Sequence, residues 1–271
     1  MRLAAGIEYA GTRYAGWQRQ TSGPSVQAEV ERALSLIANH PVEVVCAGRT
    51  DTGVHALGQV VHFDTRAIRG PRGWVLGTNG HLPTDIALVW VVPVADDFHA
   101  RFSALARTYQ YLVLNRQTRS PLAVERVCLW RTPLDAARMH EALQVLVGTH
   151  DFEAFRASQC QSRVATRRLE RIEVRREGDL MRIEIRANAF LHHMVRNIVG
   201  SALAVGEGER PVEWIGEVLA GRDRRLAGMT APAGGLYFAS VDYPADHGLP
   251  VRVLPGLSAM IGPPAFPAGP E

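Results

Sequence analysis

One acid, Asp51, lies in a short loop that gathers several polar side chains. The loop runs from Ala47 to Ala56, contains two glycines, an arginine and a histidine, and is flanked by apolar runs at 42–46 and 59–63. This pattern is typical of a loop between two strands, and it can hold a carboxylate at a fixed point above a sheet. On spacing alone, however, an Asp in such a loop is more often a turn residue that bonds its own backbone.

No cofactor motif accompanies this loop. The sequence has no Walker loop, no Gly-x-Gly-x-x-Gly between a strand and a helix, and no Gly-x-Ser-x-Gly elbow. Cys46, Cys128 and Cys160 are far apart, which disfavours a zinc ribbon or a redox pair. The adjacent His192 and His193 would point about 100° apart on the helix expected here, which makes them poor joint metal ligands. We therefore expect a reaction that uses side chains alone, with no metal and no cofactor.

Two further side chains could act with Asp51. Arg196 lies on an apolar helix expected over 190–204. An arginine in such a place commonly faces solvent, but if it faced a buried Asp51 it would keep that carboxylate ionised and hold it in place. Tyr109 shares one face of a strand expected over 106–115 with a second tyrosine. Half-buried tyrosines are common in sheets, and the functional interpretation of this face is an aromatic platform for a base.

The elements that must position these side chains are a mixture of strands and helices. The patterns predict strands at 3–9, 42–46, 59–63, 85–94, 106–115, 172–175, 181–186 and 235–243, and helices at 25–39, 135–147, 190–204 and 210–221. The stretch between 63 and 85 has no regular pattern. A sheet with helices on one face is the expected architecture.

The basic residues of the chain are all arginines, 30 in number, and the net charge is +3. The segment from Phe155 to Arg171 is the most basic, and its polar stretch at 157–162 predicts a loop that could hold phosphates. Such charge runs are usually only solvated faces. Arginine forms forked bonds to phosphate and stacks on bases, so a polyanionic partner is allowed but not demanded.

The composition indicates an ordinary globular protein. Of the 271 residues, 46% are hydrophobic and 21% are charged. No apolar run is long enough to span a bilayer, and no long apolar region of a signal peptide follows the first residues. We therefore expect a cytoplasmic protein with no membrane association.

The whole loop sequence Ala-Gly-Arg-Thr-Asp-Thr-Gly-Val-His-Ala resembles the active-site loop of the TruA family of tRNA pseudouridine synthases. Other blocks match the family in the same order over nearly the whole chain, at 16–20, 25–27, 82–83, 85–86, 98–101, 107–109, 190–197 and 235–237. The blocks around Asp51 and Arg196 are the most specific. Ala10 and Gln110 depart from the family, where Asp and Arg respectively are frequent, and these changes could alter contacts with RNA.

The resemblance implies an α+β fold made of two ferredoxin-like α/β halves, with mainly antiparallel sheets joined across a basic cleft. It places an N-terminal domain at 1–103, which carries the Asp51 loop. A C-terminal domain at 104–246 would carry Tyr109 and Arg196. A Pro- and Gly-rich tail at 247–271 would extend past the family core.

The resemblance also implies the reaction, the partners and the roles of four residues. The family converts uridine to pseudouridine at positions 38, 39 and 40 of the tRNA anticodon stem-loop and works as a homodimer. Asp51 would be catalytic, either as a nucleophile on C1′ of the sugar or as a base on C2′. Tyr109 would stack on the base, Arg196 would pair with Asp51, and Arg49 would help to displace the target base.

Two other classes of function remain open. A non-catalytic tRNA-binding protein or chaperone would tolerate the loss of Asp51. A glycosidic-bond hydrolase would release free uracil and would need a second carboxylate near Asp51, which the loop does not supply.

Overall fold

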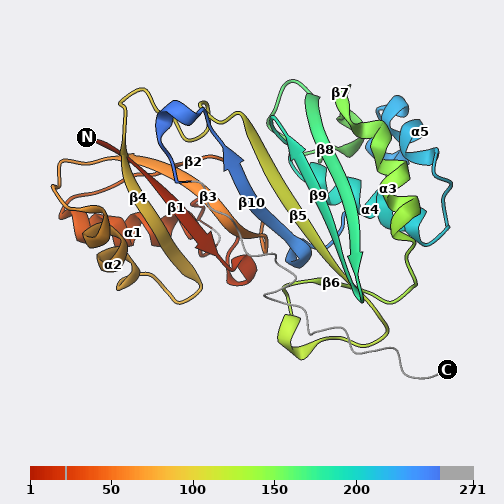
Figure 1. The fold of residues 1–271 in the computed structure, drawn as a ribbon, viewed down its shortest axis with the longest axis horizontal. Helices are drawn as coiled ribbons and strands as arrows, with labels where there is room; N and C mark the ends of the chain where they lie inside the picture. Colours follow the sequence, from red (N-terminus) through yellow and green to blue (C-terminus); the bar gives the residue numbers. More distant parts are fainter. Residues whose placement is uncertain (22, 251–271) are drawn as a thin grey trace.

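The computed structural model describes residues 1–21 and 23–250, which form one sheet of ten strands with helices packed against one face (Figure 1). The strands are β1 Arg2–Tyr9, β2 Val45–Cys46, β3 His55–Asp64, β4 Ile86–Val94, β5 Ala106–Asn115, β6 Cys128–Trp130, β7 Gly148–Asp151, β8 Thr166–Glu177, β9 Leu180–Ala187 and β10 Leu236–Asp242. The helices are α1 Val26–Ala38, α2 Pro71–Asn79, α3 Ala136–Leu143, α4 Met194–Gly206 and α5 Trp214–Gly221.

The strand order is β4-β1-β3-β10-β5-β9-β8-β7, with β2 paired to β3 and β6 paired to β5. Most ladders are antiparallel, as expected. The two halves of the sheet meet where β10 runs parallel to β3, with Tyr237 opposite His55 and Phe238 opposite Ala56. Because β10 also pairs with β5, the last strand of the described chain joins the first half of the sheet to the second. We retain the division at 103–104, between β4 and β5, as a proposal.

The first half of the chain follows its sequence pattern closely, apart from α2. Helix α1 begins after Ser25, whose Oγ accepts a hydrogen bond from the Ala28 N–H at 3.4 Å. Helix α2 was not expected, because its two glycines lower helix propensity. One of them, Gly77, lets α2 pack closely on α1, since a Cβ there would lie 3.0 Å from Cδ1 of Ile37. Of the strand expected at 42–46, only Val45–Cys46 pairs with β3.

The second half contains the expected hairpin of β8 and β9 and the expected helix after Asp135, whose carboxylate caps α3. Residues 148–151 form β7 instead of only ending that helix. The helix expected from residue 190 begins at Met194 instead, because His193 has the left-handed φ of 60° and interrupts the helical backbone. The polar stretch at 157–162 is a loop, while the arginines from 167 onward belong to β8.

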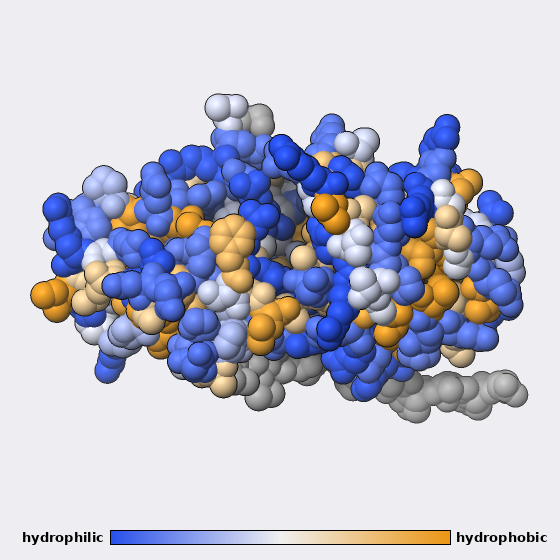
Figure 2. All heavy atoms as spheres, turned by 90° about the horizontal axis from the view of Figure 1, so that it is seen from above, coloured by the Kyte–Doolittle hydropathy of each residue, from blue (hydrophilic) through white to orange (hydrophobic). Residues whose placement is uncertain are grey.

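The main apolar core lies between the sheet and the helices, and a smaller cluster of Leu57, Leu112, Leu180 and Tyr237 lies apart from it. Figure 2 shows a hollow near the middle of one face, bordered mainly by hydrophilic side chains. Within the described ranges, no helix is long and apolar enough to cross a membrane. The tail expected at 247–271 lies outside the described residues from 251 onward.

Candidate active site

The loop of residues 47–56, here called the Asp51 loop, is fixed against the first half of the chain by backbone hydrogen bonds. The Trp17 N–H donates to the Thr50 carbonyl at 3.0 Å, and the Gly53 N–H donates to the Tyr14 carbonyl at 3.3 Å. Gly16 allows this close approach, since its φ is 108° and a Cβ there would lie 2.6 Å from the Thr50 carbonyl oxygen. The backbone on either side of Asp51 is therefore held in place.

The C-terminal end of the loop is held by His55, which is 1% exposed. Nδ1 of His55 accepts a hydrogen bond from the Gly11 N–H at 3.1 Å. Nε2 lies 2.8 Å from the Glu125 carbonyl and 3.2 Å from the Gly234 carbonyl, so it carries the proton. The ring also stacks on Tyr237 with centroids 4.8 Å apart. Burial lowers the pKa of His55 and favours this neutral form.

The N-terminal end of the loop is held by two side chains from the sheet. Nε2 of Gln59 donates to the Gly48 carbonyl at 2.6 Å, and Nη2 of Arg107 donates to the Ala47 carbonyl at 3.2 Å. Arg107 belongs to β5 in the second half of the chain. Both ends of the loop are therefore bound to the second half, so the position of Asp51 depends on how the two halves meet.

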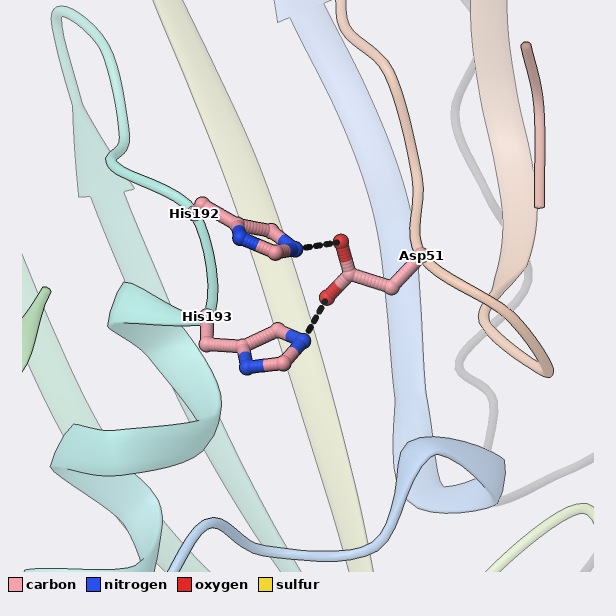
Figure 3. A group of neighbouring side chains, drawn as sticks. All are labelled: Asp51, His192 and His193. Atoms are coloured by element: carbon pink, nitrogen blue, oxygen red, sulfur yellow. Dashed lines mark ion pairs between the residues drawn. The ribbon is translucent and has the colours of Figure 1, made fainter. Parts of the chain in front are cut away.

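Three basic side chains face the carboxylate of Asp51, which is 23% exposed. Nε2 of His192 lies 3.4 Å from Oδ1, and Nε2 of His193 lies 3.4 Å from Oδ2 (Figure 3). Nη1 of Arg196 lies 3.6 Å from Oδ2. The carboxylate is thus flanked by two imidazoles and a guanidinium, an arrangement that can hold it oriented for a bound ligand.

The expectation that the two imidazoles diverge is wrong, because it assumed a helix through His192 and His193. The chain enters α4 only after His193, and the Ala157 N–H binds the His192 carbonyl at 3.0 Å. Both rings therefore point toward Asp51, as Figure 3 shows. The ligand atoms of the three residues lie within 4.8 Å of one another, close enough to hold a metal ion. The guanidinium of Arg196 beside the same carboxylate opposes a bound cation.

Arg196 itself is well fixed. Its side chain is 15% exposed, and its Nε donates to the Ala231 carbonyl at 2.7 Å. The structure thus places Arg196 beside Asp51 rather than in solvent.

Tyr109 lies on β5 and is 9% exposed. Its ring makes T-shaped contacts with the rings of Phe190 and Phe238, whose centroids lie 4.9 and 5.0 Å away. Burial raises the pKa of Tyr109 well above its usual value, and the charge of Asp51 adds to the increase. At neutral pH the side chain is therefore a neutral phenol near the carboxylate.

Arg49 lies two residues before Asp51 and is exposed. Within residues 1–21 and 23–250, its side chain forms no hydrogen bond or ion pair with the protein. Its guanidinium is therefore available to a ligand.

Comparisons of the sequence with known proteins give one family. A sequence model described as tRNA pseudouridine synthase matches residues 5–103 and 142–244. The chain is 58% identical to tRNA pseudouridine synthase A of Aeromonas hydrophila subsp. hydrophila over 92% of this chain and 93% of that protein. The protein of the same name from Xanthomonas euvesicatoria pv. vesicatoria is 56% identical over 93% of this chain and 99% of its own length.

The chain therefore belongs to the tRNA pseudouridine synthase family. The family that the Asp51 loop resembles is thereby confirmed. The family match and the mainly antiparallel sheet also confirm the expected α+β fold class.

Proposed function

We propose that this chain is an isomerase that converts uridine to pseudouridine at positions 38, 39 and 40 of the tRNA anticodon stem-loop. The observation that carries the proposal is the position of Asp51, a carboxylate held between a rigid loop and Arg196. Family membership supports the reaction, and the homologues carry the name tRNA pseudouridine synthase A. The choice of positions follows from the resemblance of the Asp51 loop to the TruA family.

The reaction needs a nucleotide that has left its stack. The bond between N1 of uracil and C1′ breaks, the base turns over, C5 bonds to C1′, a proton leaves C5, and N1 takes up a proton. Flipping the nucleotide out costs about a few kcal/mol, which new contacts with the protein must offset. Arg49 is exposed, and it helps to displace the target base, as the resemblance to the TruA family implies.

Asp51 acts at the sugar, as a nucleophile on C1′ or as a base on C2′. Either role needs the carboxylate aimed at the sugar, and Arg196, His192 and His193 lie within 3.6 Å of its oxygens. Tyr109 stacks on the uracil. It is a neutral phenol whose pKa is raised by burial, and it is a candidate to accept or relay the proton that leaves C5.

The protein works as a homodimer in the cytoplasm, with one tRNA contacting both subunits, by resemblance to the same family. Sedimentation of the free protein and of its tRNA complex tests the subunit number. One dimer per tRNA is expected, and a monomer in both samples would contradict this part of the proposal.

Tritium release tests the reaction itself. Transcripts carry 5-³H-uridine at only one of positions 38, 39 or 40 and are incubated with the protein without added metal. Release from each transcript, with pseudouridine in the digested product, is expected. Binding without release would favour a non-catalytic tRNA-binding protein, and free uracil in the product would indicate a hydrolase.

A further inference from the structure

One exposed aromatic side chain has no part in the mechanism above. Phe102 is 75% exposed, and it is the only aromatic among the large hydrophobic side chains exposed in the described part of the chain. A single exposed apolar side chain is normal on a protein surface. Phe102 differs because hydrogen bonds order its backbone, and its ring contacts the side chains of His99 and Arg101.

Hydrogen bonds close the short segment that carries Phe102. The backbone N–H groups of Arg101 and Phe102 both donate to Nδ1 of His99, each at 3.2 Å. The His99 N–H donates to Oγ of Ser103 at 3.0 Å, and the Ser103 N–H donates to the His99 carbonyl at 2.9 Å. The backbone under the ring is therefore ordered before any ligand arrives, which reduces the entropy lost on binding.

The ring of Phe102 stacks on that of His99, which in turn makes a tilted contact, at 57°, with a ring in the protein interior. Its centroid lies 4.3 Å from that of the His99 ring, at an interplanar angle of 29°. The His99 ring lies 4.8 Å from that of His62, which is buried. The guanidinium of Arg101 lies 5.6 Å from the Phe102 centroid, within the range of a cation–π interaction. Because most of the Phe102 side chain is exposed, a further flat group can pack on it beside the Arg101 guanidinium.

This segment is bound to the start of the Asp51 loop. The guanidinium of Arg107 donates both to the Arg101 carbonyl and to the Ala47 carbonyl. Burial raises the pKa of the Cys46 thiol to about 11, while the positive charges of Arg49 and Arg101 oppose that increase. The Arg107 bridge therefore ties the backbone of the Phe102 segment to the start of the loop that carries the proposed catalytic acid.

We propose that His99, Arg101 and Phe102 form a stacking platform that holds an unpaired base of the tRNA next to the flipped uridine. This inference rests on the proposed function and adds a second point of contact on the RNA. An exposed ring beside a guanidinium recognises the flat face of any base, and arginine also attracts the phosphates on either side. By holding a neighbouring nucleotide, the platform fixes where the RNA backbone enters the site.

Substitution of the ring tests the platform. The probe is an RNA hairpin with the sequence of an anticodon stem-loop, and its Kd is measured by filter binding. We expect Phe102→Ala to raise the Kd about 5- to 100-fold, the loss of one stacked base. Phe102→Trp keeps a flat ring and should stay within about threefold of the wild type. Leu122→Ala is the matched control, because Leu122 is 94% exposed and is not part of the platform.

A spectroscopic signal separates stacking from a general effect on structure. The hairpin carries 2-aminopurine at one loop position at a time, and its fluorescence is measured during titration with protein. Stacking on Phe102 should quench one position with the wild type and with Phe102→Trp, and not with Phe102→Ala. An unchanged Kd for Phe102→Ala, or no quenched position, would overturn the proposal.

Two further outcomes separate the platform from a contact between copies of the chain and from the proposed reaction. If Phe102→Ala separates two copies of the chain in sedimentation and leaves RNA binding per site unchanged, the ring belongs to a contact between copies and the platform is wrong. If the wild type quenches 2-aminopurine but releases no tritium from tRNA, the platform stands as an RNA contact while the proposed reaction fails.

Discussion

Nη1 of Arg196 lies 3.6 Å from Oδ2 of Asp51, although the two residues come from opposite halves of the chain. The same guanidinium donates through Nε to the Ala231 carbonyl. Because a backbone carbonyl fixes the arginine, the positive charge stays in place beside the carboxylate. The partial burial of both groups makes their attraction stronger than it would be on an open surface.

Removing this charge should affect activity far more than stability. We expect Arg196→Met to lower kcat by about 100-fold or more, and to lower the free energy of unfolding by only about 1–2 kcal/mol through the lost bond to Ala231. Single-turnover kinetics and urea unfolding measure the two effects. Arg222→Met is the matched control, because Arg222 lies 3.6 Å from Asp151 on the surface. A fully active Arg196→Met enzyme would remove the ion pair from the mechanism.

His193 should contribute to catalysis by holding Asp51. Burial lowers the pKa of His193, and the charge of Asp51 opposes that decrease. Its φ of 60° is a conformation that asparagine tolerates better than most residues, so His193→Asn should fold normally. We expect kcat to fall about 10-fold, the loss of one oriented contact to the carboxylate, with the RNA Kd unchanged. His81→Asn, at an exposed site, is the control. An equal loss in RNA affinity would instead make His193 a binding residue.

These two residues show what could be predicted from the sequence. The Asp51 loop carries an uncommon combination of residue types, so it identified the family and the acid. Arg196 was placed through the same resemblance. The orientation of His193 was predicted wrongly because the apolar spacing over 190–204 predicts one continuous helix. The left-handed backbone of His193 starts the helix later, and the Ala157 N–H binds the His192 carbonyl just before it.

Long-range contacts explain the other differences between the sequence-based predictions and the structure. Helix α2 is stabilised by the burial of Trp74 and by its close packing on α1, which outweigh the low helix propensity of its glycines. The hydrogen bonds of His55, here called the His55 clasp, join it to Gly11, Glu125 and Gly234. No local sequence pattern marks such a contact. Most of the long strands and the amphipathic helices were predictable because their patterns depend on neighbours in sequence.

The His55 clasp should control where Asp51 sits. His55→Ala removes three hydrogen-bond contacts and the stack on Tyr237, so we expect a loss of about 2–4 kcal/mol in unfolding free energy. The kcat should fall at a temperature where the variant is still folded. Circular dichroism and single-turnover kinetics at that temperature check both effects.

His55→Gln provides the conservative variant, since its amide can still donate toward the carbonyls of Glu125 and Gly234. It should recover part of the lost kcat. A folded His55→Ala variant with the wild-type kcat would show that the clasp stabilises the fold without positioning Asp51.

Acid should destabilise the protein through His62. Burial lowers the pKa of His62 from 6.5 to about 4, and the positive charges of Arg2 and His99 add to the decrease, while Asp64 opposes it. Nδ1 of His62 accepts the Ala100 N–H at 3.1 Å, which requires that nitrogen to be unprotonated. Since the folded pKa lies below the unfolded one, the stability contributed by the neutral ring is complete above pH 6.5 and is lost as the pH falls toward 4.

The His62→Gln variant isolates this effect, because glutamine does not titrate. We expect the wild type to lose up to about 3 kcal/mol more than the variant between pH 7 and pH 4. Urea unfolding at several pH values measures the difference in slope, whatever the absolute stability of the variant. Parallel pH curves would show that His62 titrates normally in the folded protein.

The most direct test of the central claim is the single-turnover rate of Asp51→Asn on tRNA labelled with 5-³H-uridine. Asparagine keeps the shape of the side chain and removes the charge. We predict a fall in rate of at least about 1,000-fold, with the Kd for tRNA and the unfolding midpoint close to those of the wild type. Asp97→Asn, an exposed acid, should behave as the wild type. A variant that retains a substantial rate, or that loses tRNA binding together with activity, would contradict the assignment of Asp51 as the catalytic residue.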